Sequence, residues 1–439
     1  MKRDWLSNFT LLARAPNGEK DRTLLFSRLA ILLFVIVLPF PHNALWKNLA
    51  QVGMLFSAIA LFRQGRLQAD LRSPIWLALL GLIGVFCFTA ALGSDPADSF
   101  NELRKHFLPG VLLLMLVPVV FAEPRLSRFL LAICASVFVL RTGLALGELA
   151  SYLPDLDAGR SQGLYIKGLA LDAGFYIPIL FGLILLGGSS RWMGVIGLPM
   201  VLAVMLLVQS RTPILAAAIA VLAMLLCLRR WRILAVSFAV GFLLVGYFVT
   251  SQPAIGARLA SVFDVQTYRK AFDIANYNKP EDGLSARTAI WMGVLEITEP
   301  RRWQGYGFGW KKLGRTAVEQ GYVAKWQGRQ GDALAEERAW YFALPSDKVN
   351  PHNLYVQIYF ESGLLGIAAY LLAVGGLLWV AARLSWRSLA EISIVAAMVM
   401  AYLVDHLFLG LANGLLLGLG PSFVLLALLE TVRLREKTQ

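Results

Sequence analysis

Two polar motifs stand where an apolar helix should begin, and both combine an arginine with a threonine. They are Ser210-Arg211-Thr212-Pro213 and Ser285-Ala286-Arg287-Thr288. A cation is unfavourable at the positive end of a helix dipole, so each arginine indicates an anion held there by the guanidinium and the free backbone N–H groups. We interpret Arg211 and Arg287 as a clamp for a phosphate or pyrophosphate, with the two threonines as binding residues. The alternative for each arginine is an ordinary interfacial or surface charge.

A third motif, Asn350-Pro351-His352-Asn353, opens a late apolar segment. The proline predicts a helix start that places His352 in the first turn, facing the underside of the preceding loop. The helix dipole disfavours imidazolium at this position, and a neutral imidazole is what a general base needs. We therefore expect a catalytic or substrate-binding role for His352, with Asn353 beside the substrate. The alternative is a capping or interfacial histidine, as we expect for His42 in an earlier Pro-His-Asn.

Charged residues within predicted spans are costly and suggest function or pairing. Asp405, followed by His406, is expected to orient His352 or to pair with an arginine, whereas Arg141 is expected to form a structural pair with Glu148. Basic groups on two shorter connections complete a cationic rim suited to an anionic, lipid-linked substrate. These groups are Arg104, Lys105, Arg160 and Lys167. Arg160 and Lys105 are candidate substrate-binding residues, and for both the alternative is an ordinary loop charge.

The segment Gly305-Tyr306-Gly307-Phe308-Gly309-Trp310 resembles a phosphate-binding loop only superficially, because no Lys-Ser or Lys-Thr follows it. We expect its glycines to permit a tight backbone and its aromatic rings to pack on sugar or membrane. No metal site and no cofactor are expected. The close acidic pair of an outer turn, Asp95 and Asp98, has no His or Cys companion, and the long loop from Ser251 to Asn350 contains no histidine.

The elements that position these residues are predicted to be membrane helices. The chain is 57% hydrophobic and only 16% charged, with a mean hydropathy of +0.62, and its apolar runs approach 20 residues. The fold class is therefore an all-α polytopic membrane protein with about twelve transmembrane helices and a large loop. The predicted spans are Leu24–Phe40, Ala44–Phe62, Pro74–Leu92, Phe107–Phe121, Leu126–Ala150, Leu164–Gly187, Trp192–Val208, Pro213–Leu228, Ile233–Thr250, Asn353–Ala382, Leu389–Leu409 and Leu411–Val432.

The net charge of +13 is arranged as in membrane proteins rather than as in nucleic-acid-binding proteins, because Lys and Arg crowd every second connection. This pattern predicts cytoplasmic termini and an external long loop, and no nucleic-acid partner. We expect three regions: an N-terminal bundle of about nine helices (1–250), the loop domain (251–352) and about three C-terminal helices (353–439). The three cysteines lie inside predicted spans, so no disulfide framework is expected in the loop.

The order and loop context of the motifs resemble the O-antigen ligase and polymerase superfamily, whose members are integral-membrane glycosyltransferases with a large periplasmic loop between two late helices. The matching stretches are Ser210-Arg211-Thr212, Ala286-Arg287-Thr288 with Trp291, Gly305 to Gly309, and Pro351-His352-Asn353 through Glu361-Ser362-Gly363-Leu364-Leu365-Gly366. The resemblance implies a GT-C-like bundle of twelve helices, capped by a mostly helical periplasmic loop, in the bacterial inner membrane.

The resemblance also implies a reaction. The donor would be a polysaccharide on undecaprenyl pyrophosphate and the acceptor a sugar hydroxyl of lipid A–core, with membrane lipids around the protein. Arg211 and Arg287 would bind the pyrophosphate, His352 would deprotonate or position the acceptor hydroxyl, and Asp405 would support them in an inverting, metal-independent transfer. An O-antigen polymerase and a protein O-oligosaccharyltransferase remain as alternatives. A flippase or other transporter is less favoured, because the charged groups gather at one face.

Overall fold

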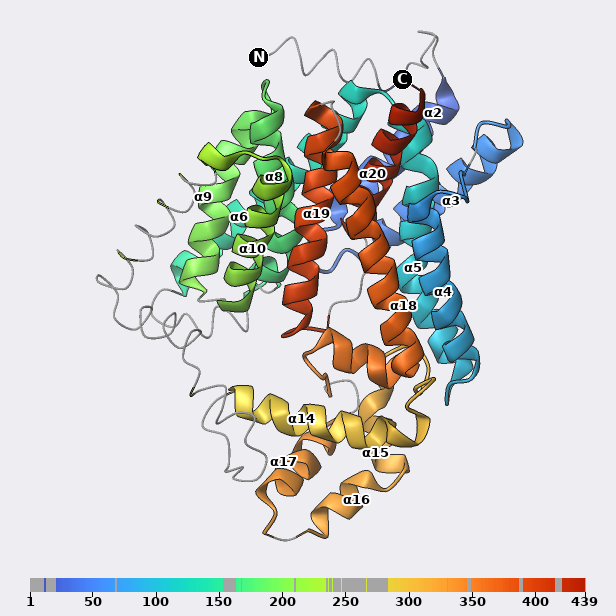
Figure 1. The fold of residues 1–439 in the computed structure, drawn as a ribbon, viewed down its shortest axis with the longest axis vertical. Helices are drawn as coiled ribbons and strands as arrows, with labels where there is room; N and C mark the ends of the chain where they lie inside the picture. The colour runs from blue at the N-terminus through green and yellow to red at the C-terminus, as the bar shows by residue number, and fades with distance from the viewer. Residues whose placement is uncertain are drawn as a thin grey trace.

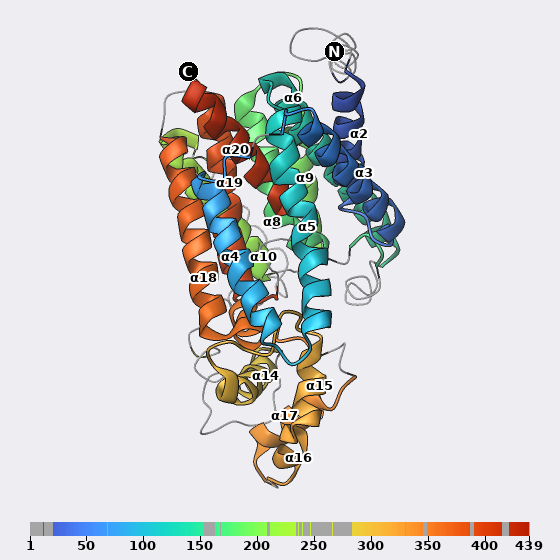
Figure 2. The ribbon, with the colours of Figure 1, turned by 90° about the vertical axis from the view of Figure 1, so that its right-hand side faces the viewer.

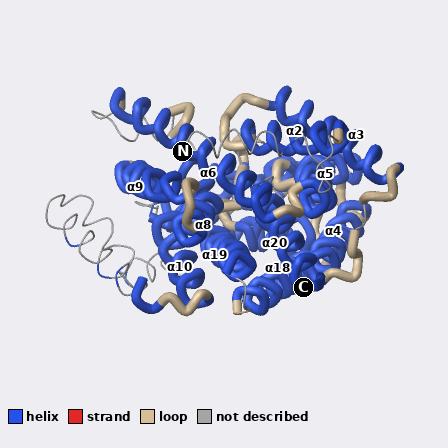
Figure 3. The backbone as a smooth tube through the Cα atoms, turned by 90° about the horizontal axis from the view of Figure 1, so that it is seen from above, coloured by secondary structure: helices blue, strands red, loops and turns tan. Residues whose placement is uncertain are grey.

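The computed structural model describes residues 21–67, 69–152, 163–166, 168–208, 211–233, 283–329, 331–345, 349–386, 390–414 and 421–438, with single residues at 12, 236, 239, 246 and 266. All regular secondary structure in these segments is helical, as Figures 1 and 3 show. Seven helices are long and apolar enough to cross a membrane. They are α3 (Ala44–Arg63), α4 (Pro74–Ala91), α5 (Pro96–Val120), α6 (Pro124–Ser151), α8 (Leu169–Leu186), α18 (Leu354–Ser385) and α19 (Ala390–Gly410).

The prediction of an all-helical protein with several apolar spans is confirmed, while the count of twelve stays a prediction. Four further helices belong to the bundle: α2 (Arg22–Val37), α9 (Arg191–Leu207), α10 (Arg211–Cys227) and α20 (Pro421–Thr438). Most of the predicted span Ile233–Thr250 lies outside the described residues. Two predicted boundaries are wrong. Helix α5 begins at Pro96, so residues 101–106 are helical rather than a loop, and α20 begins at Pro421 instead of Leu411.

The helices of the bundle run roughly side by side, and α2 begins at the same end of the bundle where α20 ends (Figures 1 and 2). The opposite end carries a group of short helices that we call the loop module, residues 283–345. It contains α14 (Gly283–Thr298), the 3-10 turn η1 (Glu299–Arg301), α15 (Lys312–Glu319), α16 (Tyr322–Gln327) and α17 (Ala333–Phe342). The module has a hydrophobic cluster separate from that of the bundle, centred on the buried rings of Trp326 and Phe342.

Helix α18 joins the module to the bundle and is broken at Gly363, whose φ of 63° and ψ of −160° are not helical. Only glycine adopts this backbone conformation without strain. Beyond the break α18 packs against α4 and α19, and α10 packs on the other side of α19. The break turns the short N-terminal part of α18 toward the loop module and leaves the rest aligned with the bundle (Figure 1).

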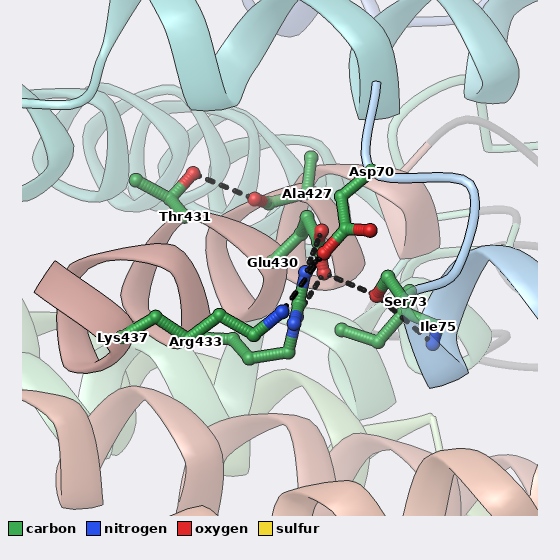
Figure 4. Close-up of polar contacts among 8 residues, drawn as sticks. All are labelled: Asp70, Ser73, Ile75, Ala427, Glu430, Thr431, Arg433 and Lys437. Carbon is green, nitrogen blue, oxygen red and sulfur yellow. Dashed lines mark hydrogen bonds and ion pairs between the residues drawn. The ribbon is translucent and has the colours of Figure 1, made fainter. Parts of the chain in front are cut away.

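A buried ionic network fixes the end of the bundle that carries the chain termini (Figure 4). Glu430 of α20, 1% exposed, accepts hydrogen bonds from Arg433 at 2.6 Å and from the Ser73 hydroxyl at 2.7 Å. Arg433 also contacts Asp70 at 2.8 Å, and Lys437 reaches the same carboxylate at 3.0 Å. Hydrogen bonds from these two cations lower the pKa of Asp70 to about 2. The network ties α20 to the connection between α3 and α4.

Candidate active site

The turn before α18 places His352 outside the helix. Asn353 is the N-cap, with its side-chain oxygen accepting the N–H groups of Tyr355 at 2.9 Å and Val356 at 3.1 Å. His352 therefore precedes the cap and has a left-handed backbone with φ of 49°, and its N–H donates to the Asn350 side chain at 2.8 Å. The expectation that His352 lies in the first helical turn is wrong, because the asparagine and not the proline sets the helix start. The residue remains partly exposed, with protein covering part of its ring.

A similar backbone recurs at His42, which has a φ of 54° and precedes Asn43, the N-cap residue of α3, although the Asn43 side chain accepts no N–H group of that helix. A Pro-His-Asn sequence is thus a way to start a helix in this chain and does not by itself mark a site. The surroundings must distinguish His352 from His42.

Those surroundings come from the loop module. The Trp291 indole of α14 donates to the Pro351 carbonyl at 2.8 Å. The Tyr341 hydroxyl of α17 donates to the Asn350 carbonyl at 2.6 Å and accepts the Asn350 N–H at 3.0 Å. On the bundle side, the Asn353 amide donates to the Leu411 carbonyl at 3.1 Å, just after α19. Two module helices and the end of α19 therefore hold one four-residue turn.

Arg287 lies beside this turn, so the structure brings two of the three predicted catalytic residues together. Burial and the nearby Arg287 guanidinium both disfavour imidazolium and hold the pKa of His352 below its usual 6.5. Arg287 is the fifth residue of α14, which begins at Gly283, so the expectation that this arginine stands at the start of a helix is wrong. Thr288, the next residue, is 3% exposed.

The third predicted catalytic residue, Arg211, is the first residue of α10, but its side chain lies outside the described part of the structure. Thr212 is half-buried in the first turn of that helix. Arg160 and Lys167 lie outside the described residues. Whether Arg211 or Arg160 joins Arg287 and His352 therefore remains a prediction.

The surroundings of two other candidates, Lys105 and Asp405, bear on their predicted roles. Lys105 lies in α5, exposed and paired with Glu102 at 2.7 Å, as expected for an ordinary surface charge. Asp405 is 2% exposed within α19 and packs against Gly174 of α8, where any larger side chain would overlap the carboxylate. Its Oδ1 has no hydrogen-bond partner, and no ion pair joins it to a described arginine. The expected contact of Asp405 with His352 or an arginine is thus absent among the described side chains.

The partner predicted for Arg141 is wrong. Its guanidinium pairs with Asp172 in the first turn of α8 and donates to the Tyr165 carbonyl at 3.3 Å. Glu148 instead accepts backbone N–H groups of residues 164–166, with distances of 2.6 to 3.3 Å. The pair is structural as predicted, but it connects two helices rather than two turns of one.

A comparison with known families covers the segment that contains this turn. Residues 195–371 match the sequence model of the O-antigen ligase family. Over this segment the chain is similar to that family, and we call residues 195–371 the O-antigen ligase domain. Members of that family are membrane glycosyltransferase-like enzymes. The match includes α10, the loop module, the 350–353 turn and the break in α18. No curated protein matches the chain.

Within the O-antigen ligase domain, the glycine-rich segment has a role that the sequence did not reveal. Its backbone runs along the break in α18, with the Tyr306 N–H donating to the Phe360 carbonyl and the Gly307 N–H to the Glu361 carbonyl, both at 2.8 Å. Tyr306 and Phe308 are 1% and 2% exposed, so the expectation that they pack on sugar or membrane is wrong. A side chain at position 305 would come within 2.6 Å of the α18 backbone, and this explains the glycine.

Two buried charges of the O-antigen ligase domain stand behind this segment. Glu361, 1% exposed, accepts hydrogen bonds from the Gly309 N–H at 3.2 Å and the Gln357 amide at 3.1 Å. Lys312, 3% exposed, donates to the Ser99 hydroxyl at 2.5 Å, and burial lowers the pKa of its ammonium. These contacts connect the module to α5 and α18. No short sequence pattern could have predicted them, because the partners are 52 and 213 residues apart.

In the segments that the structure describes, no group of three or more His, Cys, Asp and Glu side chains could hold a metal ion. The turn in the O-antigen ligase domain instead offers a neutral imidazole, a guanidinium and amide and hydroxyl groups of fixed orientation. These groups are suited to binding an anion and accepting a proton from a hydroxyl.

Proposed function

We propose that the protein is an O-antigen ligase of the bacterial inner membrane, with cytoplasmic termini and its active site at the periplasmic face. It transfers polysaccharide from undecaprenyl pyrophosphate to a sugar hydroxyl of lipid A–core. The observation that carries the proposal is the position of Arg287 beside His352, within a domain of the O-antigen ligase family. The start of α2 and the end of α20 lie at the end of the bundle opposite the loop module, which agrees with the alternation of basic connections.

The proposed chemistry is a single displacement without metal. The neutral imidazole of His352 accepts the proton of the acceptor hydroxyl, whose oxygen attacks the anomeric carbon of the donor. The bond from that carbon to the pyrophosphate oxygen breaks, and undecaprenyl pyrophosphate leaves with the bonding electrons. Arg287 and Arg211 stabilise the charge that develops on this leaving group. Attack from the opposite side inverts the anomeric configuration.

Two properties of His352 support this proposed role. Its low pKa keeps the imidazole neutral near pH 7, so the base is available without prior deprotonation. The hydrogen bonds of Trp291 and Tyr341 to the turn fix the backbone on either side of the histidine. We assign substrate binding to Thr212, Thr288 and Asn353. Arg160 and Lys105 are retained as outer binding groups, and Asp405 as a buried supporting residue.

The test is transfer in vitro with purified full-length protein, undecaprenyl-pyrophosphate-linked glycan and lipid A–core in the presence of EDTA. We expect the core band to shift on a gel, and Arg287→Ala and His352→Ala to abolish the shift. His42→Ala is the matched control for the histidine, since it has the same backbone turn, and exposed Arg329→Ala is the control for the arginine. Both controls should retain activity.

Other outcomes identify the alternatives. Lengthening of the donor glycan with an unmodified core would show an O-antigen polymerase instead of a ligase. Equal loss of activity in His42→Ala and His352→Ala would contradict the assignment of the base. Activity that requires a divalent cation would contradict the metal-independent mechanism.

A further inference from the structure

The length of α18 beyond its break matches the thickness of a bilayer core. The part of α18 from Leu364 to Ser385 is about 33 Å long at 1.5 Å per residue, close to the roughly 30 Å of a bilayer hydrocarbon core. This part of the helix therefore spans the hydrocarbon region completely, and the break at Gly363 falls at one surface of it.

The loop module is attached to the bundle at this depth. The N–H groups of Leu364 and Leu365 lack partners within α18 because of the break, and they donate to the carbonyls of Arg302 at 2.8 Å and Trp303 at 3.2 Å. In the connection between α4 and α5, the Ser94 N–H donates to the Tyr306 carbonyl at 3.0 Å. Figure 2 shows the ends of α4 and α18 side by side above the module. The turn that follows η1 thus lies at the same height as the ends of two spans.

Large apolar side chains are exposed around this turn and continue the outward-facing surfaces of both spans. We call them the interface belt. They are Phe88 (55% exposed), Leu92 (49%), Trp303 (56%), Leu364 (40%) and Leu365 (41%). A tryptophan at the end of an apolar span is typical of the headgroup region of a bilayer, where an amphipathic ring has one apolar and one wet side.

Two arginines border the interface belt. Arg301 donates to the Leu92 carbonyl at 3.3 Å, and its guanidinium lies 5.3 Å from the centre of the Tyr306 ring. Arg302 pairs with Glu299 at 3.3 Å, and both side chains are more than half exposed. An exposed pair of this kind is worth at most about 1 kcal/mol, so Arg302 can exchange the carboxylate for another anion. An arginine at a membrane surface can bury its apolar stem while its guanidinium contacts lipid phosphates.

We propose that Arg301, Arg302 and Trp303, together with the interface belt, form a membrane anchor for the loop module that binds the headgroups of anionic phospholipids. The anchor is separate from the glycan-transfer site and needs neither substrate. It fixes the height of the module, and hence of the 350–353 turn, above the bilayer.

The test compares two exposed tryptophans of the same module. We would label two full-length variants, Trp303→Cys and Trp340→Cys, with a nitroxide and reconstitute them in phospholipid vesicles. Trp340 lies on α17 and its side chain is 63% exposed. The wild-type protein, treated in the same way, gives the background from the three native cysteines. We expect the label at 303 to collide mainly with oxygen, which concentrates in lipid. The label at 340 should collide mainly with a water-soluble nickel chelate. Equal collision ratios at the two positions would overturn the proposal.

The preference for anionic lipid is tested separately with a bimane label at Leu365→Cys. Dibrominated phosphatidylglycerol in a phosphatidylcholine membrane should quench the label more than the reverse mixture does. Arg302→Gln should reduce this preference about fivefold, the value for one cation near an anionic surface. An unchanged preference would refute the headgroup assignment. Neither experiment contains a glycan or measures transfer, so a negative result in either would contradict the membrane anchor without contradicting the proposed function.

Discussion

Replacing Gly363 by alanine tests whether the break in α18 is required by the fold. The residue has φ of 63° and ψ of −160°, a combination reserved in practice for glycine. An added Cβ would overlap the carbonyl group of Trp303 and lie 2.6 Å from the Arg302 oxygen. The substituted chain must strain its backbone and must also push away the turn that accepts the N–H groups of Leu364 and Leu365.

The expected cost follows from these two contributions. Backbone strain of this kind costs about 1–3 kcal/mol. Each N–H group left without an acceptor costs about 1–3 kcal/mol in addition, and more at hydrocarbon depth. We therefore expect Gly363→Ala to lower the free energy of unfolding by at least about 3 kcal/mol, a large part of the roughly 5–15 kcal/mol that stabilises a typical domain.

Gly375 in the same helix provides the matched control. It has a helical backbone, and a Cβ there meets no atom within 4 Å. Gly375→Ala should leave stability unchanged or raise it by up to about 1 kcal/mol, because alanine is the better helix former. The measurement is thermal unfolding of both purified variants in one detergent, with glycan transfer assayed alongside. Equal unfolding midpoints for the two variants would refute the reasoning.

Three further predictions concern charged groups. Arg433→Ala should destabilise the protein by about 3–5 kcal/mol, because it leaves the buried Glu430 carboxylate without its cation, whereas Lys437→Ala should cost under about 1 kcal/mol in the same unfolding assay. The pKa of His352 is depressed, so transfer that needs the neutral imidazole should persist as the pH falls to 6.5 and be lost only below it. In a pH–rate profile, Arg287→Lys keeps the positive charge beside His352, so the pH below which activity is lost should stay near its wild-type value. Arg287→Gln removes that charge, so any residual activity should be lost at a higher pH.

Local chemistry made part of the fold predictable. The span predicted from Pro74 begins at Pro74, because Ser73 caps it and proline suits the first turn. The span predicted from Asn353 begins one residue later, with Asn353 as its cap. The long apolar runs also identified the helical class, since backbone groups in a membrane must be satisfied within their own segment. In each case the information lies within a few neighbouring residues.

The remaining features depend on partners distant in sequence. Arg141 was assigned to a carboxylate two turns along its own helix, but the carboxylate it contacts belongs to α8. The glycines at 305–309 pointed to a tight backbone, but the sequence did not show that the backbone beside them is the break in α18. The nearness of Arg287 to His352 was predicted only in general terms, and it depends on hydrogen bonds from Trp291 and Tyr341 that no local pattern encodes.

The carbonyls of Arg302 and Trp303 also bear on how the chain enters the membrane. They accept the first N–H groups of the spanning part of α18, and they are synthesised about sixty residues before it. When this span is inserted, its exposed donors reach the bilayer surface where their acceptors already stand. Replacing the loop with a short linker would leave those donors unpaired in lipid. The loop module is therefore a component of membrane assembly, because the last helices complete their hydrogen bonds only with its carbonyls.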